Sequence, residues 1–425
     1  MGVDHFVSNI YLASADSHMK KSKTHDGKRG RGKLRPVDAK LAKAVQVTLE
    51  VLRERVFKSV REARKSSGLS AAEFDQAVER LAREKLVATT EGRATRGGSP
   101  HKSIRVCGER GYVAAVDIGG TNLRVVIADM AGTIVGKWSG STVGASSPAK
   151  LVRLIHNGVS KLLRQAGLRA KALLAIAAGV PGVTDLTSGM VLLTSYLGGW
   201  RDVPLGRMLE KRFGVPAVID NDVRLGAVGE RWKGSARGVD DFVFLAIGTG
   251  VAAGICMNGE LLRGPGSAAG EVGYLIVPGT SENGVGAGNP GALEAAIGGE
   301  GIKTQWQHHT QRLYGEALHN LHATDVFERA TSGDESAKSV LERSARILAH
   351  AIYNISVVLN CPLFILGGGV GMSAILRDAT ESVLQDYSQP VRPQLRLSSL
   401  GPDAQLFGAL RLALDAAEKR IGVSA

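Results

Sequence analysis

The chain has 425 residues, of which 44% are hydrophobic and 22% are charged, with a formal net charge of +13. These proportions exclude a fibre, a disulfide-stabilised miniprotein and a wholly disordered chain, and the length predicts two to four domains. The longest uncharged apolar stretch, Phe242–Met257, is shorter than the ~20 residues that a membrane span needs.

Positive charge is concentrated in the first quarter of the chain. Residues 1–107 contain 23 Lys and Arg against 12 Asp and Glu, a net +11, whereas the rest contain 30 against 28, a net +2. Glycine has the opposite distribution, because only 8 of its 54 residues precede position 108. A basic front joined to a neutral, glycine-rich body predicts two functions in one chain.

Residues 1–36 are the most basic part of this front. Eight Lys and Arg residues between Lys20 and Arg35 face a single acid, Asp26, and apolar periodicity is missing after residue 12. Such a segment buries too little apolar surface to fold alone, which predicts a flexible basic arm. Two interpretations stay open: a solvated tail, or an arm attracted to nucleic-acid phosphates.

Residues 37–107 have the order of a winged helix-turn-helix domain. Apolar residues recur at helical spacing over 41–52, and a second short helix is expected over about 57–65. Ser70 and Glu73 form a capping box that begins a third helix. The predicted buried stripe of this helix is Phe74, Val78, Leu81 and Ala82. Two short strands around a loop with Gly and Arg complete the order.

In a winged helix-turn-helix the third helix enters the major groove and the hairpin tip lies against phosphate. The candidate contacts to double-stranded DNA are Gln76, Arg80, Arg93, Arg96 and Lys102. Glu73 and Asp75 weaken this interpretation, because base-reading Arg, Asn or Gln is expected at their positions. The alternative is a small helical module used for dimerisation.

The body contains three glycine-rich turns, each after an apolar strand. The first, DIGGTNLR at 117–124, predicts a hairpin whose backbone amides and Thr121 hydroxyl suit a polyphosphate, with Asp117 holding Mg²⁺ through water. FVFLAIGTGVAAG at 242–254 repeats the pattern, and FILGGGVG at 364–371 offers bare backbone to an adenosine. In this order they predict a duplicated actin-like ATPase fold, in which two lobes close on a nucleotide.

A further apolar strand, at 218–220, ends in Asn221 and Asp222. A carboxylate at a strand end can accept a proton from a sugar hydroxyl as it attacks a γ-phosphate, with Asn221 orienting that hydroxyl. The alternative interpretation is an Asn-Asp turn, and the flanking phosphate hairpins favour the catalytic one.

These segments resemble the ROK family of bacterial sugar kinases and sugar-responsive repressors over residues 112–425. The resemblance rests on DIGGTNLR, GVPGVTD, LGGW with the following PL, IDND, GTGVAAGICMNGELLRGPGSAAGEVGY and ILGGGV. The repressor branch carries an N-terminal winged helix, and LEVLRERVFKSVREARKSSGLS at 49–70 is similar to it. The resemblance implies an α/β fold: a two-lobed, actin-like (ribonuclease H-like) body preceded by a winged helix-turn-helix domain.

The resemblance also implies roles for individual residues. Asp222 would be a catalytic base, and Asn221, Glu271 and Glu294 would contact a sugar. The residues implied in binding ATP and Mg²⁺ are Asp117, Gly119, Gly120, Thr121, Gly248, Thr249, Gly250, Gly367, Gly368 and Gly369.

The sequence departs from the family where zinc is usually bound. One His and three Cys are replaced by Tyr274, Val285, Ala287 and Ala292. A loop without thiolates does not hold tetrahedral Zn²⁺, so zinc is not expected and no metal ligand is assigned, whereas ATP and Mg²⁺ stay possible. Tyr196 also replaces an Asn of the sugar site, and Tyr196 and Tyr274 could stack on a sugar ring or only fill the pocket.

The leading hypothesis is a DNA-binding transcriptional regulator that senses a sugar-type ligand between two lobes, without significant kinase activity. The alternatives are an ATP-dependent sugar kinase with a basic extension and a DNA-binding protein whose body only dimerises. Three cysteines without CxxC spacing favour the cytoplasm, and the absence of a signal-type opening predicts no export. We expect a homodimer or a dimer of dimers and no membrane partner.

The expected domains are an arm over 1–36, a winged helix over 37–107, an N-terminal lobe over 108–230 and a C-terminal lobe over 231–425. The last helix could return to the N-terminal lobe.

Overall fold

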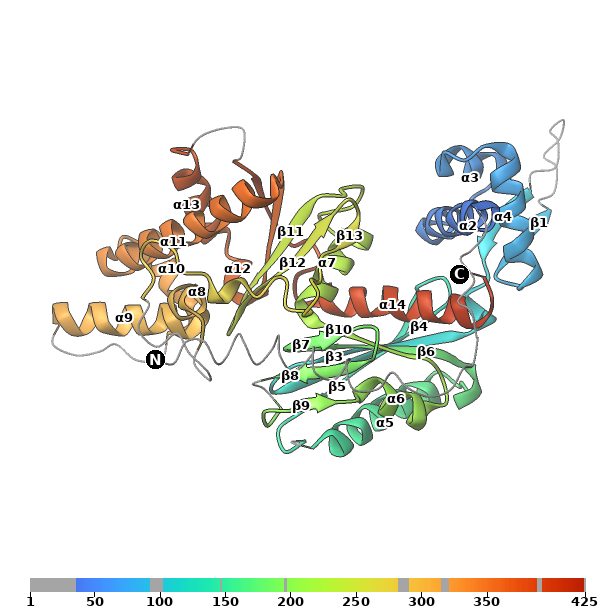
Figure 1. The fold of residues 1–425 in the computed structure, drawn as a ribbon, viewed down its shortest axis with the longest axis horizontal. Helices are drawn as coiled ribbons and strands as arrows, with labels where there is room; N and C mark the ends of the chain where they lie inside the picture. The colour runs from blue at the N-terminus through green and yellow to red at the C-terminus, as the bar shows by residue number, and fades with distance from the viewer. Residues whose placement is uncertain are drawn as a thin grey trace, which may run out of the picture. The chain divides into compact units, whose positions relative to one another are not determined.

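The computed structural model describes residues 36–91, 102–145, 147–194, 197–281, 290–314, 321–387 and 392–423 (Figure 1). They divide into two compact units. The N-terminal unit contains the described residues up to Asp220 and those from Ala409 onward, and the C-terminal unit contains Asn221–Gly408. Arg93, Arg96, Tyr196 and, apart from Pro36, the predicted basic arm lie outside the described residues. No helix in the described ranges is long and apolar enough to cross a membrane.

The first part of the N-terminal unit has the predicted order of three helices and a hairpin. These elements are α2 (Pro36–Glu54), α3 (Val60–Ser67), α4 (Ala71–Arg83), β1 (Val87–Glu91) and β2 (Lys102–Val106). Helix α3 begins three residues later than expected, because Phe57 forms an isolated bridge with Ile104 and Ser59 caps the helix. The predicted stripe of α4 is partly wrong: Ala77 is buried, whereas Ala82 is exposed.

The capping box of α4 explains an acid that is unexpected in a DNA-reading helix. The Ser70 hydroxyl accepts from the Glu73 amide at 3.3 Å, and the Glu73 carboxylate accepts from the Ser70 amide at 3.0 Å. The Nζ of Lys40 on α2 lies 3.0 Å from the same carboxylate. The hydrogen bond with Ser70, and then Lys40, lower the pKa of Glu73 to about 2. Glu73 therefore stabilises the N-terminus of helix α4 as part of its capping box.

A five-stranded sheet of order β10-β6-β3-β4-β5 forms the centre of the N-terminal unit. Its strands are β3 (Tyr112–Ile118), β4 (Asn122–Asp129), β5 (Ile134–Ser141), β6 (Leu173–Val180) and β10 (Ala217–Asn221). Helix α5 (Pro148–Gln165) packs on β4 and β5, and α6 (Leu205–Phe213) packs on α5. A small sheet contains β7 (Val183–Asp185), β8 (Met190–Leu193) and β9 (Arg201–Val203).

The C-terminal unit has a second five-stranded sheet, of order β13-β12-β11-β14-β15. Its strands are β11 (Phe242–Ile247), β12 (Val251–Met257), β13 (Glu260–Leu261), β14 (Leu363–Gly367) and β15 (Gln394–Leu397). Its helices are α7 (Asp222–Lys233), α8 (Ala292–Ile297), α9 (Gly299–Tyr314), α10 (Ala323–Thr331), α11 (Glu335–Leu359), α12 (Gly368–Gly371) and α13 (Ala374–Leu384).

The two sheets have the same topology. In each, the first strand pairs antiparallel with the second and parallel with the fourth, and the third and fifth strands form the edges. Strands β3, β4, β5, β6 and β10 thus correspond to β11, β12, β13, β14 and β15. The structure confirms the predicted duplicated, actin-like α/β architecture.

The last helix, α14 (Ala404–Arg420), joins the winged-helix elements to the sheet of the N-terminal unit. The guanidinium of Arg53 on α2 lies 2.7 Å from the Glu418 carboxylate and donates to the Met130 carbonyl, just after β4. Arg420 donates to the Leu174 carbonyl on β6 at 2.8 Å. Buried polar contacts therefore fix α2, β4 and α14 together. The residue boundaries of the four expected domains remain a prediction.

Asp415 on α14 makes stability depend on pH. Burial, with Glu418 and Glu50 nearby, raises the pKa of Asp415 to about 6 despite Arg411 at 3.0 Å and Arg53. Between its ordinary pKa and 6, the folded chain holds a proton that the unfolded chain releases. The free energy of unfolding therefore falls as pH rises through this window.

We expect Asp415→Asn to raise the free energy of unfolding at pH 7.5 by about 1 kcal/mol. The full shift corresponds to roughly 3 kcal/mol, and solvent screening of a side chain that is 34% exposed reduces it. The gain should disappear near pH 4, where the wild-type carboxyl is also neutral. Urea unfolding at both pH values measures the difference. An equal gain at both would contradict the electrostatic cause.

Candidate functional site

The first glycine turn joins β3 to β4 in the N-terminal unit. The Gly119 amide donates to the Asn122 carbonyl at 2.7 Å, and the Thr142 hydroxyl donates to the Gly119 carbonyl at 3.0 Å. These bonds fix the base of the turn, while Gly120 and Thr121 are exposed. Their amides have no acceptor among the described residues. The tip of this turn can therefore bind an anion through its backbone.

Asp117, the residue implied in Mg²⁺ binding, is engaged by a residue of the same motif. It lies opposite Arg124 in the β3–β4 register, and Arg124 Nη2 and Nε donate to Asp117 Oδ2 at 2.7 and 3.0 Å. Only 14% of the Asp117 side chain is exposed. The turn residues fit phosphate groups, whereas the carboxylate that would hold Mg²⁺ already carries a counter-charge.

The second and third glycine turns come together in the C-terminal unit. Because β11 and β14 are parallel neighbours, with Ala246 opposite Gly367, their carboxyl ends lie at one edge of the sheet. A Cβ at Gly248 would lie 3.9 Å from the Gly369 amide nitrogen. Gly368 has a φ of +78°, and a Cβ there would overlap the Ile247 carbonyl. This close approach and the positive φ explain the glycine at 368. The phosphate and adenosine roles of the two turns remain predictions.

Asn221 and Asp222 lie where β10 ends and α7 begins. The Asn221 side chain is buried and its Oδ1 accepts from the Arg224 amide at 2.9 Å, which caps α7. Asp222 is the first residue of the helix, and its Oδ1 accepts from the Val223 amide at 2.9 Å. Asn221 therefore has a capping role, and the Asp222 carboxylate is held by the first helical turn.

Three of the predicted sugar-site residues lie in one electrostatic cluster of the C-terminal unit. Glu294 on α8 accepts from the Val251 amide at 3.0 Å, beside the second glycine turn. Burial raises the pKa of Glu271, and Glu294 raises it further while Arg224 opposes the shift. Tyr274 is 50% exposed, and burial followed by Glu271 and Glu294 raises the pKa of its hydroxyl. The cluster presents carboxylates that can accept hydrogen bonds from hydroxyl groups.

Sequence reasoning missed Arg224 and the role of Arg124. Arg224 is 2% exposed, donates to the Ser267 carbonyl at 2.9 Å and acts on Glu271. The apolar residues around Arg224, in VRLGAV directly after IDND, were a signal that this arginine is buried, because Arg is rarely buried without a partner. The pairing of Arg124 with Asp117 could have been found by counting residues outward from the hairpin turn, which places the two opposite each other.

The positions that bind zinc elsewhere in the resembled family do not fit zinc here. Tyr274 closes the short helix Val272–Tyr274 and Ala292 begins α8. Gly291 packs so closely on Gly273 and Tyr274 that a Cβ there would overlap both backbones. In the described ranges, His, Cys, Asp and Glu form no group of three that could hold a metal. Val285 and Ala287 lie outside those ranges.

The candidate DNA contacts that the structure describes differ in their surroundings. Gln76 on α4 and Lys102 at the start of β2 are exposed. Arg80 on α4 instead donates to the Gly422 carbonyl, just after α14. Arg80 thus contributes to the attachment of the winged-helix elements. The roles of Gln76, Arg80 and Lys102 on DNA remain predictions.

Comparisons with known proteins extend over the body and, in one case, the front. A glucokinase from Halalkalibacterium halodurans is 31% identical over 311 residues, covering 71% of this chain and 94% of the relative. A xylose repressor from Caldicellulosiruptor bescii is 30% identical over 226 residues, covering 53% of this chain and 56% of the relative.

Two solved structures have the same fold. A glucokinase from Streptomyces griseus, in complex with glucose and AMPPNP, matches with a TM-score of 0.60 and 26% identity, covering 72% of this chain and 100% of that chain. A transcriptional regulator described as a homologue of the E. coli MLC protein matches with a TM-score of 0.74 and 22% identity, covering 90% and 98%. The model of the ROK family matches residues 113–416. This chain belongs to the ROK family.

Proposed function

We propose that this chain is a DNA-binding transcriptional regulator whose body binds a sugar. The observation that carries the proposal is the folded three-helix and hairpin segment from Pro36 to Val106. The match to the regulator covers 90% of this chain, whereas the match to the glucokinase covers 72%. The difference corresponds to the length of this front, which a sugar kinase does not require. A homodimer reading two half-sites is part of the proposal.

The ligand of the body is an uncharged sugar. Glu271 and Glu294 lie within electrostatic reach of each other and offer acceptors to hydroxyl groups. A phosphate placed between these two carboxylates would be repelled, so a neutral polyol suits the cluster better. Binding of the sugar to one of two conformations would shift their populations and thereby change DNA affinity.

Fluorescence anisotropy with DNA from upstream of the gene tests DNA binding in the full chain. Gln76→Ala should weaken specific binding by about 1–3 kcal/mol, and Lys102→Ala should weaken all sequences and lower the salt slope by about one. Lys150→Ala on α5 is the matched control, since Lys150 is also exposed. Binding without sequence preference, or equal losses in all three variants, would contradict the proposal.

A sugar kinase is the second candidate, favoured by the exposed turn amides at Gly120 and Thr121 and by the position of Asp222. The glycine turns would hold the phosphates of a nucleotide, whose γ-phosphate is the group transferred. Asp222 would accept the proton of the attacking sugar hydroxyl. A panel of hexoses with Mg²⁺ and ATP tests this, and turnover abolished by Asp222→Asn would support it. If no hexose is turned over, the kinase candidate is rejected and the transcriptional regulator is the function that remains.

A further inference from the structure

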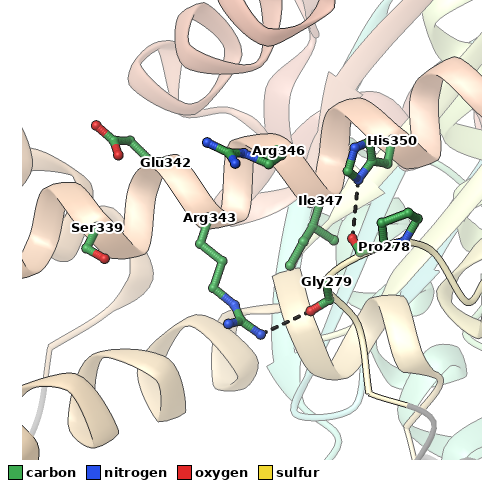
Figure 2. Close-up of a pocket in the computed structure, with 8 residues that line it drawn as sticks. All are labelled: Pro278, Gly279, Ser339, Glu342, Arg343, Arg346, Ile347 and His350. Atoms are coloured by element: carbon green, nitrogen blue, oxygen red, sulfur yellow. Dashed lines mark hydrogen bonds between the residues drawn. The ribbon is translucent and has the colours of Figure 1, made fainter.

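A pocket of about 420 Å³ lies in the C-terminal unit, between helix α11 and the turn at Pro278 and Gly279 (Figure 2). The α11 residues that line it follow helical spacing, from Ser339 to His350. Its size is within the range of small-molecule sites. None of its lining residues belongs to the candidate sugar or DNA contacts.

Two hydrogen bonds hold the walls of this pocket together, as Figure 2 shows. Arg343 Nη2 donates to the Gly279 carbonyl at 3.0 Å, and His350 Nδ1 lies 3.2 Å from the Pro278 carbonyl. A carbonyl only accepts, so Nδ1 of His350 is the donor in this contact. The His350 ring stacks on Tyr387, with centroids 6.0 Å apart and planes at 10°. The imidazole is therefore held in place from two sides.

The pocket carries positive charge without matching acids. Arg343 and Arg346 both line it, and Glu342 is the single carboxylate among its described lining residues. Arg346 forms neither a hydrogen bond nor an ion pair with any residue in the described ranges. A guanidinium has five N–H donors in a planar fork that matches phosphate oxygens. Two such groups on one face of α11 suit a phosphate, and Glu342 can accept from a hydroxyl of the same ligand.

We propose that this pocket is a second ligand site, which binds the phosphate group of a small phosphorylated metabolite. Its charge is opposite to that of the carboxylate cluster at Glu271 and Glu294, so the two sites select different compounds. Arg343 and Arg346 bind the phosphate, and the fixed His350 ring and Ile347 form the wall beside it.

The wall at Pro278 and Gly279 continues directly from the candidate sugar site. Only four residues separate Tyr274 from Gly279, and Val272 and Val277 anchor this segment in the core. The Val277 amide donates to the Thr280 hydroxyl at 3.1 Å, which fixes the turn. Because Arg343 also holds the Gly279 carbonyl, a phosphate bound to Arg343 would shift this turn and thereby act on Tyr274. This coupling, unlike the binding itself, rests on the proposed function.

Titration of the full chain with inorganic phosphate tests the site, with chloride keeping the ionic strength constant. We expect a saturable rise in the melting temperature with a dissociation constant in the millimolar range. Arg346→Gln should weaken binding at least tenfold, and Arg343→Gln with Arg346→Gln should abolish it. Glycerol 3-phosphate should bind and glycerol should not, which identifies the phosphate group as the determinant.

Lys338→Gln is the matched control. Lys338 lies on the same helix, pairs with Glu335 at 3.7 Å and is outside the pocket, so this change removes one charge without touching the site. Binding in the control should equal that of the wild type. An equal loss in the control would indicate a general charge effect, and binding that is unchanged in the double variant would belong to the glycine turns. Either result, or no saturable binding, overturns the proposal without bearing on DNA binding.

Discussion

Arg53→Ala is expected to destabilise the N-terminal unit by about 3–5 kcal/mol. The Arg53 side chain is fully buried, and the Glu418 side chain that it faces at 2.7 Å is 3% exposed. Arg53 Nε and Nη2 also donate to the Met130 carbonyl at 3.1 and 3.0 Å. Truncation leaves a buried carboxylate without its counter-charge and a carbonyl without its donors. Urea unfolding with far-UV circular dichroism measures the loss.

Two further variants test whether the loss of stability comes from this buried pair or from the removal of any charge. Arg55→Ala removes an exposed pair with Glu62, whose two side chains are 61% and 41% exposed, and should cost no more than about 1 kcal/mol. Arg53→Met combined with Glu418→Met replaces both charges by apolar side chains, and should recover much of the lost stability. If Arg53→Ala costs no more than Arg55→Ala, the buried pair does not hold α2 to α14.

Features encoded by neighbouring residues could be predicted from the sequence. The capping box at Ser70, the order of helices and hairpin, and the glycine turns all depend on residues a few positions apart. The repeated strand–turn–strand pattern also predicted the duplicated topology. The limits of α3 were missed because Phe57 pairs with Ile104, far along the chain.

The long-range contacts of charged side chains could not be predicted. Glu418 is 365 positions from Arg53, and no periodicity relates a helix near each end of the chain. Arg80 lies on the helix predicted to read DNA, yet its guanidinium donates a hydrogen bond to the Gly422 carbonyl. Arg224 acts on Glu271, although three strands, β11 to β13, separate them in the sequence. In each case only the tertiary fold selects the partner of a long, flexible side chain.

Glu230→Ala should destabilise the C-terminal unit by about 3 kcal/mol. Glu230 is fully buried on α7. Its carboxylate accepts from the Ser235 amide at 2.6 Å, from the Leu400 amide at 3.3 Å and from the Ser398 hydroxyl. Truncation leaves the buried Ser398 hydroxyl and the two half-buried amides without this acceptor. Glu230→Gln should also be costly, because its NH₂ group faces donors. Trp306, buried in the same unit, reports the transition by fluorescence.

The consequence of losing Glu230 extends to the third glycine turn. The segment after Ser398 continues into the short helix Gly401–Asp403, which packs on α12, and α12 begins within that turn at Gly368. If the glycine turns hold a nucleotide, as the kinase candidate requires, loosening the segment should weaken nucleotide binding as well as stability. Glu335→Ala is the control, because its side chain is 82% exposed and its loss should change stability by less than about 0.5 kcal/mol. Equal stability of the two variants would show that the buried carboxylate does not hold this segment, and nucleotide affinity should then be equal in both.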